Sequence, residues 1–183
     1  RSLLGRIVKQ AQDGIAEIDL VIEPVFGKAQ MKGDAFEDTC TRCFKCGNAC
    51  PNDCIEFHSP KRGARKAFAP YIKARTQGCT LCGACADVCP SGALKPFTPT
   101  RDGWLADVDM GTAHVNKAMC FSYHGRTCGA CYRACPLAGQ AMRIGVFETP
   151  IINEKNCVGC GLCEQSCLHV PQAIRVRPRE LKS

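Results

Sequence analysis

Cysteine is the residue type with the greatest capacity for chemistry in this sequence, because it accounts for 17 of the 183 residues. Sixteen of these cysteines fall into four blocks of four. In the first, second and fourth blocks the gaps between cysteines are two, two and three residues, and in the third block the first gap widens to seven. The blocks are Cys40, Cys43, Cys46 and Cys50; Cys79, Cys82, Cys85 and Cys89; Cys120, Cys128, Cys131 and Cys135; and Cys157, Cys160, Cys163 and Cys167.

This spacing is typical of the bacterial ferredoxin motif, in which three thiolates bind three irons of one 4Fe-4S cluster and the fourth binds the neighbouring cluster. Pro51, Pro90 and Pro136 directly follow the last cysteine of the first three blocks. Proline fixes φ at that point and turns the chain away. The fourth block departs from the pattern, with Leu168 in the proline position. The repeated spacing predicts four 4Fe-4S clusters.

Disulfides and zinc are the alternative uses of so many cysteines, in a structural scaffold with no redox role. A disulfide-bonded scaffold seldom places three cysteines two residues apart in every repeat, and the count of 17 is odd. A zinc ribbon uses two pairs of cysteines separated by a longer loop. The third closely spaced thiolate in each block therefore favours iron–sulfur clusters over both.

The charge and hydropathy of the chain exclude several classes of function. The formal charge of +7 would suggest a nucleic-acid partner. However, sixteen thiolates and four oxidised clusters would bring the net charge to about −1, which removes the main support for such a partner. No apolar run approaches the length of a transmembrane segment. No nucleophile with an adjacent base and no phosphate-binding glycine loop is present, so we expect an electron carrier and not an enzyme.

Short apolar segments next to the blocks predict small β-hairpins and short helices, an α+β fold of two ferredoxin-like modules that each hold two 4Fe-4S clusters. We expect the first module at residues 35–98 and the second at 99–183, after an N-terminal extension at 1–34. The expected strands follow the blocks at 55–57, 93–97, 141–146 and 173–176, and precede blocks two to four at 68–72, 113–115 and 150–152. The tips between them, 61–66 and 98–103, are polar or rich in helix- and strand-breaking residues.

The pairing of the blocks is open at this point. Tandem pairing, one with two and three with four, needs only local hairpins. Nested pairing, two with three inside one with four, is the alternative, because block one lacks a clear preceding strand. We favour the tandem arrangement.

The N-terminal extension carries apolar residues at helical spacing, which predicts an amphipathic helix. Gly5 and Gly14 weaken this helix and Pro24 ends it. The helix therefore needs a surface to pack against, either the chain's own modules, a partner subunit or a second copy of the chain. The expected docking residues are Leu4, Ile7, Val8, Ala11, Ile15, Ile18 and Ile22.

Blocks three and four, with the expanded first gap between Cys120 and Cys128 and no proline after Cys167, resemble the NapG/MauM-type ferredoxins. The resemblance covers residues 35 to 180. It implies four 4Fe-4S clusters with all sixteen block cysteines as ligands. It also implies an electron relay between a quinol-oxidising membrane partner and a terminal redox enzyme of periplasmic nitrate reduction or methylamine utilisation.

Two features depart from this family: no twin-arginine leader precedes the motifs, and the extension before block one is long. The polyferredoxin subunits of cytoplasmic tungsten or molybdenum oxidoreductases, such as those that act on aldehydes, are similar in cluster content and need no leader. They are the alternative assignment. We expect a cytoplasmic location, since the clusters are assembled there, and a periplasmic one if a twin-arginine leader preceded Arg1.

Cys54 is the seventeenth cysteine and lies four residues after block one. We expect it to be a small buried side chain. The alternative is that it substitutes for Cys50 as a cluster ligand.

Overall fold

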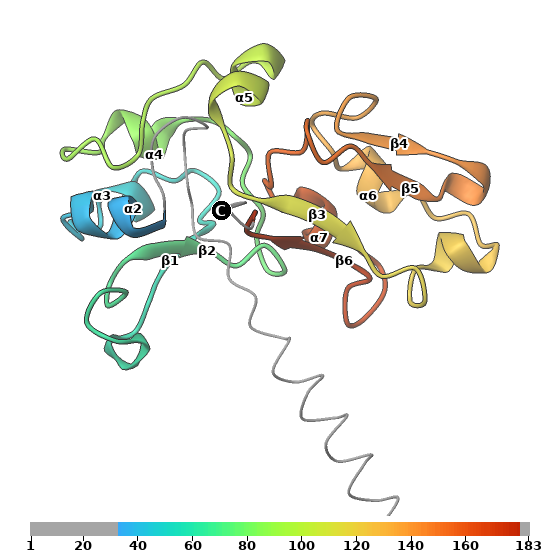
Figure 1. Ribbon diagram of the computed structural model, residues 1–183, viewed down its shortest axis with the longest axis horizontal. Helices are drawn as coiled ribbons and strands as arrows, with labels where there is room; N and C mark the ends of the chain where they lie inside the picture. Colours follow the sequence, from blue (N-terminus) through green and yellow to red (C-terminus); the bar gives the residue numbers. More distant parts are fainter. Residues whose placement is uncertain (1–32, 180–183) are drawn as a thin grey trace, which may run out of the picture.

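The computed structural model describes residues 33–179, and the side chains from Phe36 onward. Figure 1 shows two modules side by side, the first drawn in blue to green and the second in yellow to red. The predicted N-terminal helix and its seven docking residues lie outside the described residues. The first module contains the helices α2 (Gly33–Thr39), α3 (Lys45–Asn48), η2 (Pro60–Arg62) and α4 (Ala84–Asp87) and the strands β1 (Ile55–Phe57) and β2 (Pro70–Ile72).

The second module has more regular structure than the first. Its helices are α5 (Arg101–Asp107), η3 (Phe121–His124), α6 (Ala130–Arg133), η4 (Val146–Glu148) and α7 (Leu162–Gln165), and its strands are β3 (Thr112–Val115), β4 (Met142–Ile144), β5 (Pro150–Ile152) and β6 (Ile174–Arg177). The helix α6 packs against α7, just as α3 packs against α4 in the first module. The two modules therefore share one plan.

Three two-stranded antiparallel sheets connect the cluster loops. The hairpin β1–β2 joins blocks one and two, with Ile55 opposite Ile72, and the hairpin β4–β5 joins blocks three and four, with Met142 opposite Ile152. The third sheet pairs the strand before block three with the strand after block four. Alternating buried residues explain this pairing, because Ile174 and Val176 of β6 both face the core. The predicted hairpins between blocks one and two and between blocks three and four are confirmed, whereas the one predicted between blocks two and three is wrong, because β3 pairs with β6.

One expected strand is wrong: residues 93–97 form no strand. The equivalent strand of the second module, β6, pairs with β3. In the first module the helix α2 directly precedes block one, and within residues 33–179 no strand pairs with residues 93–97. Ala93 and Leu94 are nevertheless buried, and they contribute packing without a sheet.

The connection between the modules also differs from the expected breaker-rich tip. Thr100 caps the helix α5 by accepting a hydrogen bond from the Gly103 amide at 3.3 Å. The Trp104 ring N–H donates to the Leu81 carbonyl at 3.1 Å, which fixes α5 on the first module. The chain then enters the second module through the buried residues Val108 and Met110.

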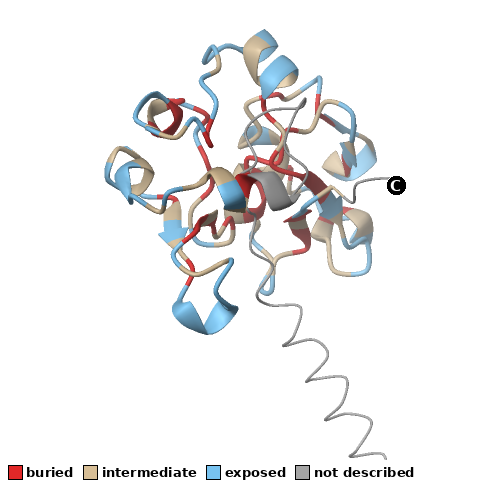
Figure 2. Cartoon of the chain, turned by 60° about the vertical axis from the view of Figure 1, so that its left-hand side comes forward, coloured by how far each residue is buried: buried red, intermediate tan, exposed pale blue. Residues whose placement is uncertain are grey.

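Buried residues gather in the middle of the molecule, along the boundary between the cluster loops (Figure 2). Apolar residues such as Ile72, Leu81, Leu137 and Met142 are at most 2% exposed. The same core cluster includes block cysteines from both modules. The cysteine loops and the apolar core are therefore one packing unit, so binding at these loops should couple to folding.

Candidate iron–sulfur sites

The sixteen block cysteines line four separate pockets, four cysteines to a pocket. Each pocket combines the first three cysteines of one block with the last cysteine of the other block in the same module. Site I is Cys40, Cys43, Cys46 and Cys89; site II is Cys50, Cys79, Cys82 and Cys85; site III is Cys120, Cys128, Cys131 and Cys167; and site IV is Cys135, Cys157, Cys160 and Cys163. The structure thus groups the blocks in tandem.

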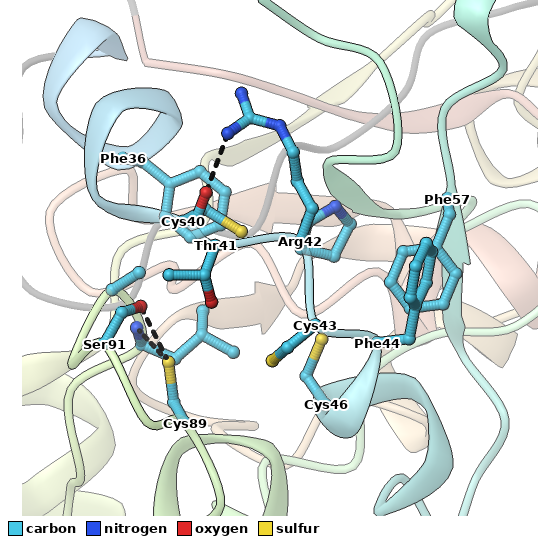
Figure 3. A pocket seen from close by; sticks show the side chains of 13 residues that line it. Phe36, Cys40, Thr41, Arg42, Cys43, Phe44, Cys46, Phe57, Cys89 and Ser91 are labelled. Carbon is cyan, nitrogen blue, oxygen red and sulfur yellow. Dashed lines mark hydrogen bonds between the residues drawn. The ribbon is translucent and has the colours of Figure 1, made fainter.

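Site I illustrates how the surrounding side chains enclose the sulfurs (Figure 3). Phe36 and Phe57 line the pocket together with Leu94. The Arg42 guanidinium donates to the carbonyls of Cys40, Arg65 and Ala67 at 2.7, 2.7 and 3.1 Å, which holds the loop of site I against the turn before β2. The walls are mostly apolar, as expected for a site that limits solvent access to a cluster.

The second cysteine of each block is followed by a residue in the left-handed conformation. Gly83, Gly129 and Gly161 have φ of 83°, 54° and 82°, and each precedes a short helix. In block one Phe44 takes this place with φ of 62°, a conformation that is unfavourable for a bulky side chain. The left-handed residue reverses the chain so that the third cysteine, in the following helix, turns back toward the first two.

Backbone amides point at several of the sulfurs. The Leu81 amide donates to the Cys79 sulfur and the Leu94 amide donates to the Cys89 sulfur, both at 3.4 Å. The amides of Ala113 and Ala173 donate to Cys157 and Cys167 at 3.4 and 3.3 Å. Such bonds stabilise negative charge on a cysteine sulfur and raise the reduction potential of a bound cluster. These amides fit a set of thiolates.

Burial makes free thiolates unfavourable in these pockets. Burial, together with the charges of neighbouring sulfurs, raises the pKa of Cys46 and of Cys131 to about 11 and that of Cys85 to about 12. At neutral pH the thiolate form therefore requires a compensating positive charge, which a bound metal centre supplies.

The spacing of the side chains argues against a single metal ion at any site. Zinc at about 2.3 Å from four sulfurs would draw those sulfurs to about 3.8 Å from one another. Within residues 33–179 no three histidine, cysteine or acidic side chains converge closely enough to hold one ion. Four sulfurs around a wider space fit the corners of a cubane cluster better than one tetrahedral ion.

The four sites follow one another in the order I, II, IV, III. Cys46 of site I and Cys85 of site II are close enough for their charges to interact, and the same holds for Cys79 of site II with Cys160 of site IV. Cys163 of site IV interacts in turn with Cys131 of site III. The spatial order therefore differs from the order of the blocks in the sequence.

The two modules meet at the loops of sites II and IV. The Cys79 amide donates to the Cys160 carbonyl at 2.7 Å. The Gly78 amide donates to Gln165 Oε1 at 2.9 Å, and Gln165 Nε2 donates to the Gln77 side chain at 2.9 Å. A Cβ at Gly78 would lie 2.7 Å from the Leu162 nitrogen, so only glycine permits this approach. No pattern within either block indicated this contact.

Cys54 is buried, as expected, but it does more than fill space. Its side chain is 3% exposed and lines the pocket of site II beside the four block cysteines. Its sulfur lies 3.5 Å from that of Cys50. A hydrogen bond from Cys54 lowers the pKa of Cys79, although burial opposes this shift. The sequence analysis missed these contacts.

The chain belongs to the family described as "4Fe-4S dicluster domain", which matches residues 39–93 and 106–170. The two matched segments each cover one pair of blocks. The chain is therefore an iron–sulfur protein of the ferredoxin type, with two dicluster segments that bind 4Fe-4S clusters.

Curated relatives narrow this class. The chain is 37% identical to "Methylamine utilization ferredoxin-type protein MauM" of Methylophilus methylotrophus, over 80% of this chain and 67% of that protein. It is 31% identical to "Ferredoxin-type protein NapG" of Haemophilus influenzae, over 94% and 64%, and 34% identical to the protein of that name from Escherichia coli, over 81% and 68%. The chain spans about two thirds of the length of these relatives. The predicted resemblance to NapG/MauM-type ferredoxins is confirmed.

In the part of the chain that the structure describes, no helix has the length and apolar character needed to cross a lipid bilayer.

Proposed function

We propose that this chain is an electron-transfer subunit that relays electrons through four 4Fe-4S clusters between a redox enzyme and a second donor or acceptor. The observation that carries the proposal is the grouping of sixteen cysteines into four pockets of four sulfurs. A bound 4Fe-4S cluster accepts and releases one electron. The proposed ligands are the sixteen block cysteines, divided among sites I to IV as defined above.

The chain's own residues hold the sulfurs, exclude water and balance charge. Each of the inner sites II and IV has two buried cysteines, although Cys82 of site II is exposed. At the ends of the series, none of the four cysteines of site I or of site III is buried, and Cys43 of site I is exposed. We propose that electrons enter and leave at sites I and III and pass through sites II and IV between them.

Exposed apolar side chains border both terminal sites, which supports partner contacts at the two ends. Phe44 lines site I and is 42% exposed. Leu168 lines site III and is 68% exposed, and Val170 beside it is 86% exposed. Apolar groups left in solvent beside a redox site are typical of contact surfaces. The proposed partners are a redox enzyme, of the molybdenum or tungsten class, and a membrane quinol dehydrogenase.

The proposed module boundaries are 35–98 and 99–183. The hydrogen bond from Trp104 to Leu81 holds α5, the first helix of the proposed second module, against the first module. The first proposed module contains blocks one and two, which form sites I and II, and the second contains blocks three and four, which form sites III and IV.

Metal analysis gives the first test. Anaerobically purified protein is expected to contain about sixteen iron and sixteen acid-labile sulfide ions per chain, because four cubane clusters each hold four of both. Iron and sulfide are measured by colorimetric assay and zinc by mass spectrometry. Protein that holds zinc in place of iron, or that is colourless, would contradict the proposed function.

The N-terminal segment gives a second test. We propose that its apolar stripe, which includes Leu4, Ile7 and Ile18, docks the chain onto a partner subunit or a second copy. Burying several such side chains at about 1.5 to 3 kcal/mol each supports a stable contact. Deleting residues 1–24 is expected to leave the iron content unchanged and to release the chain from its complex, measured by co-purification. A truncated chain that loses iron would show that the segment belongs to the chain's own core.

A further inference from the structure

Site II differs from the other three sites because five cysteines, not four, line it. Cys54 joins Cys50, Cys79, Cys82 and Cys85 in the same pocket. A cubane cluster takes four cysteine ligands. One sulfur of this pocket therefore has another role.

A comparison of the four blocks within the chain identifies Cys54 as the additional residue. Cys54 stands directly before Ile55, the first residue of β1. The corresponding residues before Met142 of β4 and before Ile174 of β6 are alanines, and the residue before Leu94 is an alanine as well. All four positions are buried to the same degree, with Cys54, Ala141 and Ala173 each 3% exposed. Cys50, in contrast, occupies the same place in its block as Cys89, Cys135 and Cys167.

The contacts of Cys54 are to ligand sulfurs. Its Sγ lies 3.5 Å from that of Cys50, which block one contributes to site II. Cys79, the first cysteine of block two, lines the same pocket. A thiol has one proton to donate and a thiolate ligand has none. When Cys50 is a ligand, Cys54 is the donor in the contact between them.

We propose that Cys54 is a positioning residue that donates an S–H···S hydrogen bond to the Cys50 ligand sulfur of site II and raises the reduction potential of that site alone. The inference rests on the proposed function. A hydrogen bond to a ligand sulfur stabilises the reduced state, which carries one more negative charge. Alanine at the three corresponding positions provides no such donor.

A raised reduction potential at site II affects the relay because site II lies at the boundary between the modules. The Cys79 amide donates to the Cys160 carbonyl across the boundary between the modules. Site II is therefore the last site of the first module on the path to site IV. A raised potential there favours residence of the electron at the boundary, before it crosses into the second module.

The test is a redox titration of the full chain followed by EPR, with iron analysis of the same samples. Cys54→Ala, which restores the residue found in the other three blocks, is expected to keep about sixteen irons. One of the four potentials should fall, with a several-fold change in its reduction equilibrium constant, where a tenfold change is about 59 mV for one electron. Cys54→Ser keeps a donor and should restore most of the shift.

Two outcomes would overturn the inference. Loss of iron in Cys54→Ala would show that Cys54 is a ligand, and four unchanged potentials at full iron content would show that it only fills space. Either result leaves the proposed function standing, because that proposal fails only if the unaltered chain lacks iron and sulfide.

Discussion

Replacing Cys120 and Cys128 together by alanine is expected to lower the iron content from about sixteen to about twelve per chain, because site III then keeps only two of its four sulfurs. Adding Cys167→Ala to this variant should cost no further iron, since Cys167 belongs to the site already lost. Adding Cys135→Ala should cost at least one further iron, and about four where the whole of site IV is lost. Iron analysis of the three variants measures each loss.

The two additions are matched controls for each other, since each removes the last cysteine of a block in the second module. If every block held its own cluster, Cys135→Ala would be silent and Cys167→Ala would cost iron. If blocks were paired in the nested way, both additions would cost iron. A base variant that falls to about eight irons would show that site III is needed to fold the module. The same comparison would then use Cys40 and Cys43 with Cys89.

The cysteines of each site could largely be predicted from the sequence, because the spacing of the first three cysteines in a block is a local property of the chain. Three cysteines at gaps of two residues can reach one cluster only if the loop reverses, and Gly83, Gly129 and Gly161 mark where it does. The exchange of the last cysteine follows from the same motif. The choice between tandem and nested pairing did not follow, because it depends on the partners of short strands and not on the blocks.

The absent strand at residues 93–97 shows why an apolar segment alone does not predict a strand. The segment has the apolar character of a strand, but a strand also needs a partner. In the second module the partner directly precedes block three, whereas in the described part of the first module the helix α2 directly precedes block one. A sequence pattern that describes one segment at a time does not contain this information.

Cys54 is a case in which the sequence held a signal that went unused. An apolar segment follows each of the four blocks. When the blocks are aligned on these segments, Cys54 takes the same position as Ala93, Ala141 and Ala173. A single cysteine among three alanines indicates a site-specific role. Its place in the pocket of site II beside Cys79, however, requires the fold, because Cys79 is distant from it in the sequence.

The contact between the modules could not be predicted from the sequence, and it carries the second large effect. Gly78→Val is expected to slow electron passage between sites II and IV strongly while the iron content stays near sixteen per chain. A Cβ at residue 78 would lie 2.7 Å from the Leu162 nitrogen and 2.9 Å from the Gly161 carbonyl carbon. Both are backbone atoms, so the modules must move apart.

That movement would break the bonds that join the two loops. The Gly78 amide would lose Gln165 Oε1, and the Cys79 amide would lose the Cys160 carbonyl. Each hydrogen bond contributes about 0.5 to 1.5 kcal/mol. Electron tunnelling falls steeply with distance, so a small displacement at this point interrupts the whole series. Gln165→Ala removes only the side-chain bridge and should have a smaller effect in the same direction.

One measurement on the fully reduced protein, one on the partly reduced protein and one control variant test this expectation. The magnetic interaction between the inner clusters, seen as broadening of their EPR signals, should weaken in Gly78→Val. Rapid-freeze EPR after partial reduction should show slower redistribution of electrons between the modules. Gly92→Ala is the control in the same module, because it adds the backbone strain of a side chain at φ of 66° but no clash, since nothing lies within 4 Å of a Cβ at that position. Unchanged coupling in Gly78→Val at full iron content would mean that the Gly78 contact does not set the separation of sites II and IV, and the proposed order of the relay would lose its central step.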